Sequence, residues 1–155
     1  MVKKRVIRKN HNCVIRPKKK KMAAIEIVYK GNNKTECVDP SARVIASQTN
    51  LPAGEAPEAY NPMQLLCIAG AACTLSTLGA VAQVHNFSVE GMKATVDYTV
   101  TDKPKQLKRI HMVIDLRGHD YSPKEKKILQ LATEQCLVIR SLSADVEKVV
   151  EFLFS

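Results

Sequence analysis

The stretch from Asn61 to Val84 reads NPMQLLCIAGAACTLSTLGAVAQV, and it decides the fold. Asn61 is a residue type that caps helix N-termini, and Pro62 suits the first helical position. No charged residue follows through Val84. The stretch therefore predicts a buried helix of about 23 residues, about 35 Å long. A membrane span is the competing interpretation, but five polar side chains dilute the apolar run, namely Gln64, Thr74, Ser76, Thr77 and Gln83.

Strand-like runs lie on both sides of this helix. Before it, residues 23–29, 35–38 and 42–47 predict the three strands of a small antiparallel sheet. After it, residues 87–101 and 107–116 predict a hairpin, and the Ser122–Glu125 capping box begins a second helix. A short helical piece at 138–142 and a last strand at 146–152 complete the chain. This order of elements predicts an α+β domain.

Composition divides the chain into two parts. The chain has 155 residues, 45% of them apolar, which suits one globular domain. Its net charge of +9 is concentrated in residues 1–21, which hold ten of the 24 Lys and Arg residues and no acidic residue. We therefore expect residues 1–21 to be a basic leader or tail without folded structure, and residues 22–155 to be the domain. A nucleic-acid-binding arm is the alternative for residues 1–21, because phosphates attract such a charge block.

The cysteines indicate a reducing compartment. Their number is odd, their spacing is irregular, and the chain has no stretch typical of an export signal. We therefore expect a cytoplasmic protein without structural disulfides and without a membrane partner. No CxxC pair occurs and the histidines are scattered, so no metal site is predicted. The five cysteines are Cys13, Cys37, Cys67, Cys73 and Cys136.

Two of these cysteines belong to a composite pattern. Cys73 follows small residues in the helix that Asn-Pro opens, and Cys136 lies 63 residues later in ATEQCLVIRSL, ahead of the last strand. With this pattern, residues 22–155 resemble the OsmC/Ohr family of thiol-dependent hydroperoxide reductases, and Met63 after the Asn-Pro is similar to its YhfA-like branch. The resemblance implies an OsmC-like α+β fold, with antiparallel sheets wrapped around two long central helices in an intertwined homodimer and active sites at the subunit interface.

The resemblance also implies a chemistry for organic or inorganic hydroperoxides. Cys73 would attack the peroxide and become a sulfenic acid, and Cys136 would resolve it as a disulfide that an external dithiol reduces. No metal or organic cofactor is needed. Separately, helix geometry disfavours Cys67 as the partner of Cys73. Six helical residues separate two Cα atoms by about 9 Å, whereas a disulfide spans at most about 7 Å.

The sequence departs from the family at the residues that support the reactive thiolate. The family uses an arginine from the first hairpin, held by a glutamate directly after the Asn-Pro. Here Met63 stands at the glutamate position, and the hairpin turn at 31–34 has no arginine. Arg43 and Arg140 are the candidate replacements, and Lys34 is a weaker one because it lacks the arginine fork. We expect Met63 and Tyr60 to line a pocket.

Two functions therefore stay open. The first is a thiol-dependent peroxidase that uses Cys73 and Cys136. The alternative is a catalytically degenerate OsmC-like protein that binds a small apolar ligand at the dimer interface. A cysteine in an apolar element is most often a small buried hydrophobe, which is what we expect of Cys67 and Cys37.

Overall fold

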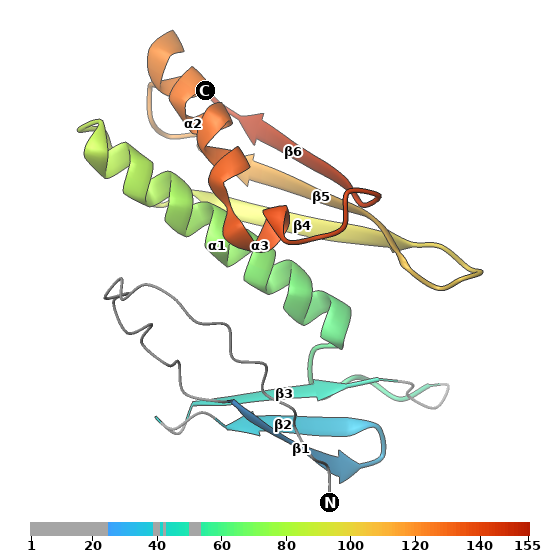
Figure 1. The fold of residues 1–155 in the computed structure, drawn as a ribbon. Helices are drawn as coiled ribbons and strands as arrows, with labels where there is room; N and C mark the ends of the chain where they lie inside the picture. The colour runs from blue at the N-terminus through green and yellow to red at the C-terminus, as the bar shows by residue number, and fades with distance from the viewer. Residues whose placement is uncertain (1–24, 39–40, 42, 50–53) are drawn as a thin grey trace, which may run out of the picture.

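The computed structural model describes residues 25–38, 41, 43–49 and 54–155, so the predictions for residues 1–21 and for the start of the first strand lie outside the described residues. The described residues follow the predicted α+β order (Figure 1). The elements are β1 (Glu26–Gly31), β2 (Lys34–Val38), β3 (Val44–Gln48), α1 (Pro62–Val84), β4 (Lys93–Val100), β5 (Leu107–Asp115), α2 (Pro123–Ala132), the 3-10 turn η1 (Thr133–Gln135), α3 (Leu137–Arg140) and β6 (Glu147–Leu153).

Helix α1 begins with the cap that its sequence predicts. The backbone N–H of Gln64 donates to Asn61 Oδ1 over 2.9 Å, and the N–H of Asn61 donates to Gln64 Oε1 over 2.8 Å. Asn61 Nδ2 also donates to the Tyr98 hydroxyl of β4 over 3.3 Å, which ties the start of the helix to a strand. By length and composition α1 could cross a membrane. In the structure it packs as a core helix, with a buried face of Cys67, Ala71, Thr74, Leu78 and Ala82.

Strands β4, β5 and β6 form the sheet on which α1 lies (Figure 1). The central strand β5 alternates as predicted and buries Ile110, Met112 and Ile114 in the core. It pairs antiparallel with β4 but parallel with β6. This parallel pair corrects the expectation of purely antiparallel sheets. The chain crosses over through α2, η1 and α3 before β6, and such a crossover returns a strand in the same direction.

The strand expected at 87–101 begins later than predicted. Residues 87–92 form a turn, in which the N–H of Met92 donates to the Val89 carbonyl over 3.1 Å. Gly91 adopts a φ of +81°, which favours glycine. Phe87 packs edge-on against Tyr121, with ring centroids 6.1 Å apart. The apolar residues of 87–92 therefore pack beside the core as a loop, and alternation alone could not show where pairing starts.

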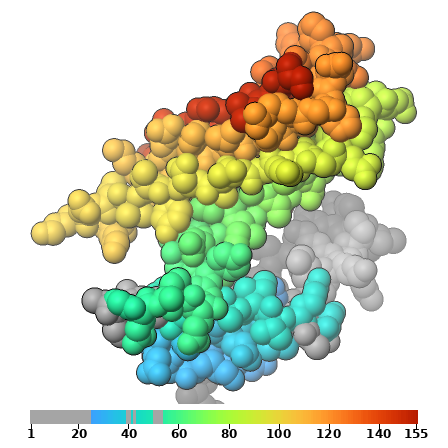
Figure 2. Space-filling model, turned by 180° about the vertical axis from the view of Figure 1, so that it is seen from behind, coloured from blue at the N-terminus to red at the C-terminus, as the bar shows by residue number. Residues whose placement is uncertain are grey.

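Strands β1, β2 and β3 form the predicted antiparallel sheet, apart from the body of helix and sheet (Figure 1). Figure 2 shows these blue and cyan strands as a separate lobe. Their apolar side chains are largely exposed: 65% for Ile27, 66% for Tyr29, 60% for Val44 and 55% for Ile45. Successive residues on a strand point to opposite faces, so exposure of both Val44 and Ile45 means that neither face is covered in the single chain.

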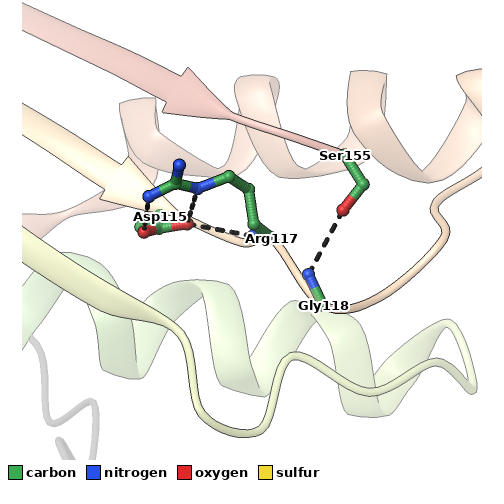
Figure 3. A network of polar contacts seen from close by, with 4 residues as sticks. All are labelled: Asp115, Arg117, Gly118 and Ser155. Atoms are coloured by element: carbon green, nitrogen blue, oxygen red, sulfur yellow. Dashed lines mark hydrogen bonds and ion pairs between the residues drawn. The ribbon is translucent and has the colours of Figure 1, made fainter.

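A polar network joins the end of β5 to the C-terminal residue (Figure 3). Arg117 donates to both carboxylate oxygens of Asp115, over 3.0 Å from Nε and 2.7 Å from Nη2. The N–H of Gly118 donates to Ser155 Oγ over 3.2 Å. The guanidinium of the exposed Arg117 lowers the pKa of the half-buried Asp115 carboxyl to about 2. The low pKa of Asp115 is therefore caused by a charged neighbour, which gives a reference for the pKa values of the cysteine thiols.

Candidate active site

Cys73 and Cys136 come from separate elements. Cys73 lies in the middle of α1 and is half-buried. Cys136 follows η1 and precedes α3, and its exposed fraction is 0%. The extended backbone of Cys136, with φ −61° and ψ 112°, turns the chain from η1 into α3. Figure 1 shows α3 lying beside α1, so the segment 136–140 returns to the helix that carries Cys73.

The packing of α3 on α1 occurs at a glycine. A Cβ atom on Gly70 would lie 2.8 Å from Ile139 Cδ1, so the glycine leaves room for this side chain of α3. The Cys136 thiol donates to the Gly70 carbonyl, with 3.8 Å between Sγ and the oxygen. The Thr74 hydroxyl donates to the same carbonyl over 3.0 Å. Cys136 is therefore held against the turn of α1 that precedes Cys73.

Neutral hydrogen-bond donors surround Cys73, and most of them belong to the segment that begins at Cys136. The backbone N–H of Val138, the Cys136 thiol, the backbone N–H of Leu137 and the Thr77 hydroxyl all lower the pKa of Cys73, while partial burial opposes them. Leu137 and Val138 are the first residues of α3, whose N–H groups have no acceptor within that helix. A thiolate at Cys73 supplies the missing acceptor. The arrangement therefore favours a nucleophilic sulfur.

The other predicted site residues lie elsewhere or act otherwise. Arg43, directly before β3, and Arg140, at the end of α3, are both exposed. Among the described residues, neither arginine is one of the groups that lower the pKa of Cys73. Met63 is half-buried in the first turn of α1, and Tyr60 is 58% exposed beside a cavity. The structure thus brings the two cysteines together, and it supplies donors that are not arginines.

Cys67 occupies a different environment on the same helix. It lies at a cavity of about 380 Å³ between the start of α1 and β4, which is lined by Tyr60, Gln64, Cys67, Ile68, Val96, Asp97 and Tyr98. Burial, and then the negative charge of Asp97, raise the pKa of the Cys67 thiol. Cys67 therefore stays protonated and buried, the packing role that its sequence context predicts.

Residue patterns missed two contributors to the site. The backbone N–H groups of Leu137 and Val138 cannot be recognised as site residues from the sequence, although the sequence predicts a short helix at 138–142. Thr77 follows Cys73 by one helical turn, and that spacing places both on one face. Its hydroxyl also donates to the Cys73 carbonyl over 2.8 Å. Within the described part of the chain, no cluster of His, Cys, Asp or Glu could hold a metal ion.

The family model for OsmC-like proteins matches residues 54–151, well over half of the chain. The chain belongs to the OsmC-like family. The match begins in the loop before α1 and ends within β6, so it includes both cysteines. Among curated proteins, none matches this OsmC-like chain.

Solved structures support the OsmC-like fold. A protein of Psychrobacter arcticus 273-4, named for osmotic stress induction and a detoxification response, superposes with a TM-score of 0.78 at 22% identity, over 88% of this chain and 99% of that one. The OsmC-like protein of Mycoplasma pneumoniae gives 0.74 at 14% identity, over 88% and 99%. The organic hydroperoxide resistance protein OhrB of Bacillus subtilis gives 0.62 at 18% identity, over 84% and 98%. At these identities the likeness shows the fold alone.

Proposed function

We propose that this OsmC-like protein is a thiol-dependent peroxidase that reduces organic or inorganic hydroperoxides through a Cys73 sulfenic acid and a Cys73–Cys136 disulfide. The observation that carries the proposal is the position of the Cys136 thiol against the Gly70 carbonyl, on the turn of α1 that precedes Cys73, beside a sulfur whose pKa is lowered. Some relatives of the same fold are named organic hydroperoxide resistance proteins, which supports the same chemistry.

The reaction takes two steps at these sulfurs. The Cys73 thiolate attacks the distal oxygen of a hydroperoxide, so an S–O bond forms, the O–O bond breaks, and the alkoxide takes up a proton to leave as an alcohol. Cys136, as its thiolate, then attacks the sulfur of the Cys73 sulfenic acid, and hydroxide leaves as water once protonated. The resulting disulfide is reduced by an external dithiol. Because the Cys136 thiol already lies against the turn of α1 that precedes Cys73, the second step needs no large movement.

Thiolate stabilisation at Cys73 does not rest on the Arg–Glu pair of the family. The two backbone N–H groups at the start of α3 lower the pKa of this sulfur through hydrogen bonding. Hydrogen bonds to a charged acceptor are stronger than those to a neutral one, so these donors favour the thiolate over the thiol. This arrangement accounts for a reactive Cys73 in a chain with Met63 at the glutamate position.

The active protein is, in this proposal, a homodimer. The exposed apolar side chains of β1–β3, such as Ile27 and Tyr29, have no cover in the single chain, and contiguous apolar surface of this kind marks an interaction site. A second copy would cover this sheet. Sedimentation should give twice the chain mass of 17.2 kDa, and Ile27→Lys should shift the protein toward the monomer. A monomeric wild-type chain would contradict this part of the proposal.

A second candidate is a binding protein without catalysis. The cavity beside Cys67, about 380 Å³ in volume, favours it, because Ile68 and Val96 offer apolar walls and Tyr98 also lines it. Cys73 is not among the residues that line this cavity. A small apolar ligand could therefore bind there without any thiol chemistry.

Peroxide consumption separates the two candidates. With dithiothreitol as the dithiol, the wild-type protein should consume tert-butyl hydroperoxide, and Cys73→Ser should abolish consumption. Cys136→Ser, treated with one equivalent of peroxide in the absence of dithiol, should stop at a sulfenic acid on Cys73 that dimedone traps. Cys37→Ser, a change in β2 away from the pair, is the control and should keep the wild-type rate. A wild-type protein that neither consumes peroxide nor forms the disulfide would favour the binding protein.

A further inference from the structure

The two sulfurs of the pair differ in access. Cys136 is fully buried, with its Sγ against the Gly70 carbonyl, whereas Cys73 is partly exposed on α1. Ile139 packs over the same glycine and adds to the cover on this side. If this disulfide forms without rearrangement of α1 and α3, one of its sulfurs belongs to a half-buried residue and the other to a residue with no exposed surface.

We propose that the reducing thiol attacks the Cys73 sulfur of the Cys73–Cys136 disulfide, so that the mixed disulfide forms on Cys73 and Cys136 is the group that leaves. This inference rests on the proposed function, because it concerns the reduction that closes the catalytic cycle. It assigns unequal roles to the two sulfurs in recycling, in addition to their roles toward peroxide.

Leaving-group chemistry alone would favour the opposite direction. A thiol with a lower pKa leaves faster, and the donors around Cys73 lower its pKa, which favours attack on Cys136. One pKa unit, however, changes such exchange rates only about threefold. An attacking thiolate must reach the sulfur along the S–S axis, and a sulfur with no exposed surface offers no such path. Access therefore decides the direction of attack.

The steps of recycling balance as follows. A thiolate of the external dithiol attacks Cys73 Sγ, an S–S bond to Cys73 forms, and the Cys73–Cys136 bond breaks with its electron pair on Cys136. The second thiol of the reductant then attacks the reductant's own sulfur in the mixed disulfide, which releases the Cys73 thiolate and a cyclic disulfide. Cys136, freed beside Cys73, competes by attacking Cys73 again.

Mass spectrometry can locate the mixed disulfide. The full-length chain is oxidised with diamide, mixed briefly with glutathione, quenched in acid and alkylated, and its cysteine peptides are then mapped. We expect glutathione on Cys73 in at least about tenfold excess over Cys136, with the alkyl group on Cys136. The matched control is the same oxidised chain in urea, where both sulfurs are accessible and the excess should fall to about threefold or less.

Each outcome bears on the inference. Glutathione mainly on Cys136 overturns it, and so does an excess on Cys73 that persists in urea, since burial would then not be the cause. Failure of diamide to form the Cys73–Cys136 disulfide also overturns it, because the two sulfurs would not meet. If diamide forms the disulfide but peroxide does not, the proposed peroxidase fails while the direction of attack is still measured.

Discussion

Cys67 and Cys73 lie six residues apart on α1, yet their surroundings shift the thiol pKa in opposite directions. Burial and the charge of Asp97 raise the pKa of Cys67, whereas hydrogen-bond donors lower the pKa of Cys73. The helix itself provides neither effect, since both cysteines lie beyond its first turn, where its dipole acts. The difference comes from what packs on each: β4 beside Cys67, and the segment that begins at Cys136 beside Cys73. A single return of the chain to α1 therefore lowers the pKa of one thiol and leaves the other with a raised pKa.

Selective alkylation is the largest effect that this comparison predicts. At pH 7, iodoacetamide should modify Cys73 at least about 100-fold faster than Cys67, because Cys73 is both more exposed and more ionised. Peptide mapping of the native protein after short reaction times measures the ratio. In urea the ratio should approach one. Equal rates in the folded protein would remove the distinction between the two sites.

Leu137→Pro tests the backbone donors. Proline removes the N–H of Leu137 that points to Cys73, yet it suits the first position of α3, and the extended Cys136 suits a residue before proline. We expect the pKa of Cys73 to rise and its alkylation at pH 7 to slow about three- to tenfold. Leu137→Ala is the matched control, because it removes the 73% exposed side chain but keeps the N–H. Equal slowing in both variants would assign the effect to the side chain instead.

These two tests also mark what the sequence could and could not predict. The ends of α1 follow from local signals, the Asn61–Pro62 start and the apolar run, and they agree with the structure. Cys73 and Cys136 were paired only through resemblance, because their contact depends on how α3 packs. The sequence predicts a stabilising side chain, Arg43 or Arg140, because residue patterns display side chains alone. Backbone N–H groups occur at every non-proline residue, so their use at Leu137 and Val138 required the fold.

The pH dependence of stability should differ in sign between the two cysteines. A lowered pKa at Cys73 stabilises the fold above the ordinary cysteine pKa of about 8.5, and this contribution is lost as pH falls through the folded value. A raised pKa at Cys67 stabilises the fold below about 8.5, and this contribution is lost as pH rises through the folded value. From pH 7 to 10, wild type should therefore gain stability relative to Cys73→Ser and lose it relative to Cys67→Ser. Denaturant titrations measure both differences, and slopes of the same sign would contradict the assignment.

Ionic strength produces the smallest expected change and separates neutral donors from a cation. Asp115 owes its low pKa to Arg117, an exposed charge, so about 1 M salt, where the screening length is about 3 Å, should move that pKa upward. Cys73 owes its lowered pKa to N–H, thiol and hydroxyl groups, which carry no net charge, so the same salt should leave the pH profile of its alkylation in place. Asp115, followed by NMR in the same samples, is the internal control. If salt moved both groups together, a cation such as Arg43 or Arg140 would be stabilising the thiolate, and the contrast between the two cysteines would rest on charge after all.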